Sequence, residues 1–283
     1  MPMQKIAKDL LVETKFPGVT VGAIVGSDGV ICVDAPTQPA DARAWRQQVE
    51  QTTGKPIRFV VVLDHHRDRN LGVQWLEAPV VAHEQTYERL RLLPELYRNL
   101  PPEPGADSEL VTDLSGLRVV LPQVTFAERL TLVAGDREVY LTHRPGVAPG
   151  ALWVEIPAQG VVFTGDAVTH KAPALLGEAD LDLWLEALAE LRKKRTPGRN
   201  IVPGRGGVTD KDGVKPTEDF LKLARRKVEV FVRARKPRAE LEALAGELLG
   251  RPAGPADIRS LYQRRLRLGL EHLYDQLTIA PLK

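Results

Sequence analysis

Six consecutive ionisable residues follow the apolar run 59–63, and their types decide which chemistry they can perform. They are Asp64, His65, His66, Arg67, Asp68 and Arg69. Carboxylate and imidazole side chains bind metal ions, whereas an arginine stays protonated and pairs with anions. The apolar run shows no polar alternation and predicts a short buried strand. The cluster therefore lies at the end of a strand, where layered α/β proteins usually carry their chemistry.

Three later segments place further polar residues at the ends of predicted strands. They are LTHRPGVAPGALWVEIP (141–157), VVFTGDAV (161–168) and NIVPGRGGV (200–208). The four segments, in this order, resemble the metallo-β-lactamase superfamily, in which His-x-His-x-Asp-His follows a strand and Pro-Gly-His, Gly-Asp and Pro-Gly-His-Gly come later. The resemblance extends over about residues 6–214. It implies an α/β fold, the αββα sandwich of that superfamily.

Carried over position by position, the resemblance assigns seven residues to the two metal ions of the superfamily. They are Asp64, His66 and Val147 for the first metal, Asp68, Arg69 and Arg205 for the second, and Asp166 as the bridge between them. Valine offers no lone pair, and an arginine repels a dication. A catalytic zinc ion takes three protein ligands and a water molecule. The sequence therefore predicts that the dinuclear zinc site is degraded.

The charges at these positions indicate what replaces the metals. Three carboxylates would converge in one pocket, and buried carboxylates must find cations or take up protons. Arg69 and Arg205 can supply positive charge as forked partners. We expect a pocket with no cofactor, in which Arg69, Arg205 and Asp68 occupy the catalytic positions of the superfamily without its hydrolase activity. Arg69, Arg205 and His170 are then the candidate ligand-binding residues of a ligand pocket or a structural network.

A second hypothesis keeps an enzyme. Asp64, His66 and Asp166 would hold one divalent ion, for which this carboxylate-rich set favours iron or manganese over zinc. The ion would deliver hydroxide to a small ester, lactone, thioester or amide. Asp68 would accept a proton, and Arg69 or Arg205 would stabilise the oxyanion.

Two further histidines lie close enough in the sequence to rebuild a metal site. His65 stands between two of the assigned positions, where we expect a role at the surface or beside the ligands. His170 follows Asp166 by four residues and is the better reserve ligand, although a hydrogen-bonded loop histidine is the simpler interpretation.

The elements that must position these residues follow from the hydrophobic pattern. Apolar runs at 19–25, 30–34, 59–63 and 80–82 predict strands, and 41–54 and 83–93 predict helices. The proline-rich segment 94–113 predicts a loop or a short-helix excursion, which is either a substrate-facing lid, as such folds often carry there, or a plain connector. The runs at 117–122, 129–135, 138–143 and 151–157 predict a meander of strands, and residues 181–194 predict an amphipathic helix.

The composition changes to helix formers beyond residue 215, where three segments each have a proline near their start. We therefore predict a domain over 1–214 and a helical extension over 215–283 that packs on it. The extension has 15 basic and nine acidic residues. Nucleic-acid binding through Arg264, Arg265 and Arg267 is a further alternative, less favoured because acids alternate with the bases. Apolar residues at helical spacing make a homodimer through these helices plausible.

Composition restricts the classes of partner and the cellular location that we expect. The net charge is only +2, and Cys32 is the single cysteine, so no internal disulfide can form. No run of 18 apolar residues exists, and the first residues lack the apolar core of a signal peptide. We expect a cytoplasmic protein with a small-molecule ligand and no membrane partner.

Overall fold

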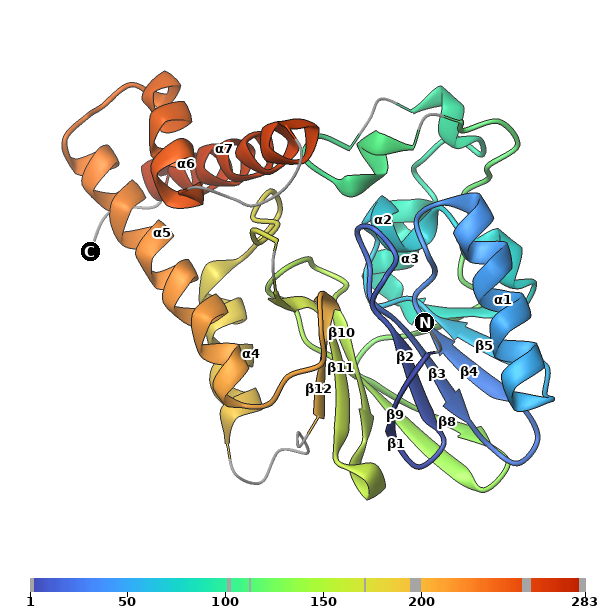
Figure 1. Ribbon diagram of the computed structural model, residues 1–283. Helices are drawn as coiled ribbons and strands as arrows, with labels where there is room; N and C mark the ends of the chain where they lie inside the picture. Colours follow the sequence, from blue (N-terminus) through green and yellow to red (C-terminus); the bar gives the residue numbers. More distant parts are fainter. Residues whose placement is uncertain are drawn as a thin grey trace.

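The computed structural model describes residues 3–100, 103–111, 113–170, 172–193, 200–250 and 256–279. Two β-sheets pack face to face, and helices cover the outer face of each sheet (Figure 1). This arrangement is the predicted αββα sandwich with a C-terminal helical extension. No helix among the described residues is long and apolar enough to cross a membrane.

The first sheet has seven strands in sequence order. They are β1 (Gln4–Ala7), β2 (Leu10–Glu13), β3 (Val21–Val25), β4 (Val30–Val33), β5 (Ile57–Val61), β6 (Val80–His83) and β7 (Val124–Phe126). The strands β4 to β7 run parallel to one another. Because the carboxyl ends of parallel strands meet at the same edge of a sheet, the residues that follow β4 and β5 lie side by side.

The second sheet has the order β12-β11-β10-β9-β8. Its strands are β8 (Arg129–Ala134), β9 (Arg137–His143), β10 (Leu152–Ile156), β11 (Val161–Thr169) and β12 (Asn200–Arg205). The strands β8 to β11 form an antiparallel meander, in which β8, β9 and β10 correspond to the predicted runs 129–135, 138–143 and 151–157. The last strand, β12, lies parallel to β11, which brings Arg205 close to the carboxyl end of β11.

In the described part of the chain, four α-helices precede the extension. Six 3₁₀ turns lie between the other elements, the last of them within the extension. The α-helices are α1 (Pro39–Thr53), α2 (Arg67–Asn70), α3 (Glu84–Leu90) and α4 (Leu181–Arg192), and the 3₁₀ turns are η1 (Val73–Leu76), η2 (Tyr97–Asn99), η3 (Asp107–Leu110), η4 (Pro157–Gln159), η5 (Asp212–Val214) and η6 (Arg238–Glu240). The predicted helices 41–54 and 83–93 correspond to α1 and α3. Gly54 ends α1 in the left-handed conformation, which glycine adopts without strain.

Three apolar clusters hold the layers together. One lies between the two sheets and includes Ile31, Val61 and Phe163. A second joins the first sheet to α1 through the buried Trp45. The third joins the second sheet to α4 and to the extension, with Trp184 at its centre. Each fully buried side chain of this size contributes about 1.5–3 kcal/mol to folding.

The extension consists of α5 (Lys215–Arg233), α6 (Leu241–Leu249) and α7 (Ala256–Ile279). Figure 1 shows α5 alongside α4, and α7 directed toward the segment that contains η2 and η3. Leu266, Leu270 and Leu273 of α7 are buried in the third apolar cluster. The extension is thus continuous with the core of the second sheet.

The predicted strand at 117–122 was wrong. Leu117 accepts a hydrogen bond from the backbone of Tyr97, and Arg118 forms only an isolated bridge with Leu96. Leu117 and Val119 pack instead in a small cluster around Tyr97, whereas Val120 packs against the cluster of the first sheet. The strand that joins the sheet here is β7, a few residues later.

Candidate functional site

The predicted ionisable cluster begins in a tight turn after β5 and continues into α2. Asn70 fixes this turn, because its side-chain nitrogen donates hydrogen bonds to the carbonyl oxygens of Asp64 and His66. The hydroxyl of Thr37 donates to the carbonyl oxygen of Asp68 at 2.6 Å. Asp68 and Arg69 lie within the short helix α2 (Arg67–Asn70), and both side chains are buried.

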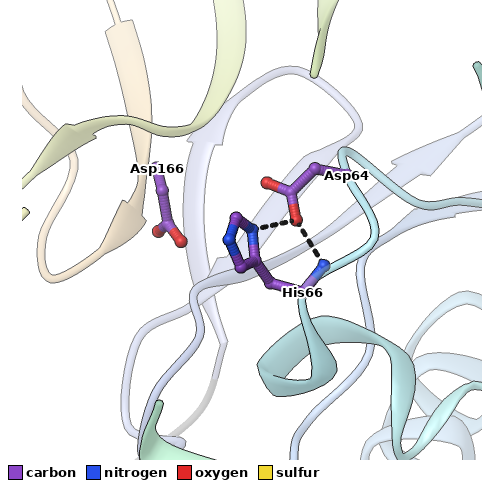
Figure 2. Close-up of side chains that lie close together, drawn as sticks. All are labelled: Asp64, His66 and Asp166. Carbon is purple, nitrogen blue, oxygen red and sulfur yellow. Dashed lines mark hydrogen bonds and ion pairs between the residues drawn. The ribbon is translucent and has the colours of Figure 1, made fainter. Parts of the chain in front are cut away.

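Asp64 and His66 form a close pair (Figure 2). Asp64 Oδ1 lies 2.9 Å from His66 Nδ1 and accepts a hydrogen bond of the same length from the His66 backbone nitrogen. Figure 2 shows the imidazole between Asp64 and Asp166, which comes from β11 in the opposite sheet. Burial lowers the pKa of His66, but Asp64 outweighs it and raises that pKa to about 10. The imidazole is therefore a cation at neutral pH.

Arg69 lies at the centre of three carboxylates and is fully buried. Its guanidinium nitrogens lie 2.6 Å from Asp34, 2.9 Å from Asp64 and 2.6 Å from Asp166. Burial alone would raise the pKa of Asp64, but Arg69 and His66 hold it well below its usual range. One guanidinium thus joins residues that follow β4 and β5 to a residue of β11, across the two sheets.

Arg205, the last residue of β12, makes a second set of ion pairs. It lies 2.5 Å from Asp68, 3.3 Å from Asp166, and in contact with Asp107. Burial alone would raise the pKa of Asp68, but Arg205 and Arg265 lower it to about 2. Gly204 permits this approach, since a Cβ atom there would lie 2.3 Å from Asp166 Oδ1.

A third guanidinium connects the site to the extension. Arg265 of α7 is 2% exposed, lies 2.5 Å from Asp107 Oδ2, and donates to the carbonyl oxygen of Gly105 at 2.6 Å. Asp107 belongs to the segment 94–113, here called the covering segment, whose backbone nitrogens at 107 and 108 donate to Asp68. Residues 101, 102 and 112 of that segment lie outside the described residues. The covering segment therefore contacts the site through hydrogen bonds to Asp68, and α7 contacts it through the ion pair of Arg265 with Asp107.

We call this set of nine residues the ion-pair network. Its carboxylates are Asp34, Asp64, Asp68, Asp107 and Asp166, and its cations are Arg69, Arg205, Arg265 and His66. Five negative charges face four positive charges. Burial raises the pKa of Asp34 to about 7 although Arg69 opposes the shift. Glu103 lies 3.8 Å from His66 Nε2 at the edge of this set, so protonation of Asp34 would offset only part of the excess negative charge.

Comparison with known proteins places the chain in a family. The model of the metallo-beta-lactamase superfamily matches residues 15–206. The chain belongs to this superfamily. It covers 98% of a metallo-β-lactamase from Pontibacter korlensis with 78% of its own length, at 21% identity and a TM-score of 0.60.

Two other solved structures have the same fold. One is the DIM-1 metallo-β-lactamase exposed to ceftazidime, with a TM-score of 0.62 and 17% identity, over 78% of this chain and 96% of that one. The other is TMB-1, with a TM-score of 0.60 and 16% identity, over 78% and 97%. At these identities the likeness establishes the fold.

The residues present do not fit the dinuclear metal site that the superfamily implies. Val147 is 2% exposed and packs in the apolar cluster around Trp184, so it offers no ligand. The guanidinium groups of Arg69 and Arg205 both contact Asp166, the position of the bridging carboxylate. Two fixed cations at this carboxylate repel the two dications of the superfamily's site.

A single metal ion fits the donor set better. Asp64, His66 and Asp166 each offer a ligand atom, and these atoms lie within 4.8 Å of one another. Asp64 Oδ2 is buried without a hydrogen-bond partner among the described residues. This group could hold one divalent ion if His66 lost its proton and the ion displaced the guanidinium contacts of Asp64 and Asp166.

The two reserve histidines lie outside that group. His170 Nε2 lies 3.1 Å from the carbonyl oxygen of Gly213, and its backbone nitrogen donates to the carbonyl of Arg205. His65 stacks on His66 with 4.9 Å between ring centroids, and its Nε2 lies 3.4 Å from Glu178. Through this contact His65 lowers the pKa of Glu178 to about 2.

Three members of the ion-pair network were missed at the level of the sequence. A signal existed for Asp34, because it follows the apolar strand β4 as Asp64 follows the neighbouring β5. No spacing pointed to Asp107 or Arg265, which come from an irregular segment and from a helix 158 residues later. Arg265 is therefore buried in the site and unavailable as a surface residue for nucleic acid.

Proposed function

We propose that this chain is a non-hydrolytic member of the superfamily, in which the ion-pair network takes the place of the dinuclear metal centre. The observation that carries the proposal is the double contact of Asp166 with Arg69 and Arg205. The negative charges that would attract metal ions are already compensated by side chains of the protein itself. The site then has a structural role, and a ligand would bind next to the ion-pair network.

The burial of the site supports the same proposal. Asp64, Asp166, Asp68 and Arg69 are at most 1% exposed. Hydrolysis requires a carbonyl carbon within about 3–3.5 Å of the attacking oxygen. The covering segment and α7 lie over the network and contact it through Asp107 and Arg265.

The structural role follows from the elements that the network joins. Arg69 connects the two sheets, and Arg205 connects the second sheet to α2 and the covering segment. Arg265 adds the extension. Buried ion pairs are costly to desolvate, so they favour one arrangement of these parts more than they add net stability.

A second candidate is the hydrolase with one metal ion, favoured by the orphaned Asp64 Oδ2 within the group Asp64, His66 and Asp166. In this case Asp68 would act as proton acceptor and the ion would be iron, manganese or zinc. The raised pKa of His66 opposes it, because a metal ion must displace the imidazole proton.

Elemental analysis separates the two candidates. The chain is expressed with added iron, manganese and zinc, desalted without chelator, and measured by plasma mass spectrometry. We expect a metal content far below one ion per chain. About one equivalent of metal that disappears in His66→Gln, together with hydrolysis of a model thioester, would establish the mononuclear enzyme. The matched control is Glu178→Gln, which removes a carboxylate outside the metal group.

Three predictions from the sequence stay predictions: the small-molecule ligand, the homodimer through the extension, and the cytoplasmic location. The nucleic-acid alternative loses its most direct support, since Arg264 pairs with Glu109 at 2.5 Å and Arg267 with Glu242 at 3.1 Å. Basic side chains that are already paired within the chain contribute less to phosphate binding.

A further inference from the structure

A small cavity lies under the covering segment, beside the ion-pair network. Its volume is about 60 Å³, and its polar lining consists of Arg67, Tyr97, Glu103, Ser108 and Glu109. Four apolar side chains complete the wall. One water molecule occupies about 30 Å³ in the liquid, so the space suits a group of about two or three heavy atoms.

Two hydroxyl groups of this wall have no partner. Tyr97 is 1% exposed and Ser108 is 7% exposed, and neither hydroxyl has a hydrogen-bond partner among the described residues. An unsatisfied buried hydroxyl costs about 1–3 kcal/mol, so such groups in native proteins are nearly always paired. Two of them on one cavity indicate that the cavity receives a polar guest.

The charge beside these hydroxyls specifies the guest. Arg67 has no ion-pair partner among the described residues, and its guanidinium stacks over the Tyr97 ring at 5.9 Å from the centroid. The two carboxylates of the wall are already engaged. Glu103 accepts a hydrogen bond from the Arg67 backbone nitrogen at 2.8 Å, and its carboxylate lies 3.8 Å from Nε2 of the cationic His66. Glu109 pairs with Arg264. The unmatched groups of the cavity are therefore one cation and two hydroxyls, which suit an anion.

We propose that this cavity binds the carboxylate group of a small organic acid. Arg67 would pair with the carboxylate, and the hydroxyls of Tyr97 and Ser108 would donate hydrogen bonds to its oxygens. A planar group of three heavy atoms has the size that the cavity accepts. The assignment moves the anion-binding role from Arg69 and Arg205, which are saturated by carboxylates, to the unpaired Arg67.

The proposal goes beyond the non-hydrolytic function and does not depend on it, because none of the three binding side chains belongs to the ion-pair network or to the possible metal group. A chain with no metal and no acetate binding would contradict this proposal alone. A chain with metal and acetate binding would contradict the proposed function alone.

The test is calorimetric titration of the full chain with sodium acetate at constant ionic strength, with acetamide as the neutral analogue of equal shape. We expect acetate to bind and acetamide not to bind. Tyr97→Phe removes only the hydroxyl and should weaken acetate binding about tenfold or more, and Arg67→Gln should weaken it further. The matched control is Arg43→Gln, since Arg43 also stacks over an aromatic ring, that of Trp75, away from the cavity.

Several results would overturn the proposal. Absence of acetate binding to the unmodified chain would mean that water fills the cavity. Equal binding of acetate and acetamide, or acetate binding unchanged in both variants, would place the binding elsewhere. Near-ultraviolet circular dichroism reports whether each variant is folded, and Ser108→Ala replaces Tyr97→Phe if the latter does not fold.

Discussion

Arg67 and Arg69 stand two residues apart in the short helix α2, yet they lie in opposite environments. Arg69 contacts three carboxylates and has no exposed surface, whereas Arg67 has no ion-pair partner among the described residues and borders a cavity. The difference separates two uses of a guanidinium. In the ion-pair network the guanidinium charge is compensated by carboxylates of the chain itself, whereas beside the cavity we propose that it pairs with a ligand.

The largest expected effect comes from opening the network at Arg205. Arg205→Ala leaves Asp68, Asp107 and Asp166 without a shared cation, and should reduce the free energy of unfolding by about 3–5 kcal/mol. Urea titration at neutral pH measures it. Arg58→Ala, which removes an exposed pair with Asp28, is the control and should cost less than about 1 kcal/mol. An equally small loss in Arg205→Ala would mean that the ion-pair network contributes little to the free energy of unfolding.

The next effect concerns the attachment of the extension. Arg265→Met removes the contact with Asp107 and should cost about 2–3 kcal/mol. Hydrogen exchange should show lost protection in 103–111 and in α7 while the sheets stay protected. Arg267→Met, on the same helix but paired with the exposed Glu242 and the partly buried Glu271, is the matched control. Uniform loss of protection across both sheets would show that α7 does not unfold independently of the sheets.

A smaller effect is expected from pH. The pKa of His66 is raised in the folded chain from 6.5 to about 10, so its pairing with Asp64 stabilises the fold fully below pH 6.5. That contribution is lost as the pH rises through about 10. Urea titrations between pH 6 and 10 should show a decline, on the order of 1–2 kcal/mol, that is absent in His66→Gln. The same decline in the variant would assign it to other groups.

The smallest effect should come from the cavity. Tyr97→Phe removes a hydroxyl that has no hydrogen-bond partner among the described residues, so in acetate-free buffer it should leave the free energy of unfolding unchanged or raise it by up to about 1 kcal/mol. Thermal unfolding measures the change. A clear destabilisation would show that the hydroxyl is paired in solution. The cavity would then contribute to stability as the ion-pair network does.

The hydrophobic pattern predicted the layers well because it depends on local periodicity. The buried runs around Val60 and Phe163 became central strands, and the amphipathic segment after Asp180 became α4. The run 117–122 failed, because short apolar runs do not distinguish a strand from a segment that packs in a small satellite cluster. The contacts of Arg69 and Arg205 with aspartates were also predictable, since both stand at positions where the superfamily gathers carboxylates.

The sequence by itself determined the superfamily fold, the loss of ligands at Val147, Arg69 and Arg205, and the need for charges to be balanced within the chain. Only the tertiary structure decided which charges meet. Asp107 and Arg265 enter the site because a covering segment and a distant helix fold over it, and Arg67 makes no ion pair among the described residues although Glu103 lines the same cavity. Ion pairing acts over a few ångströms in space, and separation along the sequence does not constrain it.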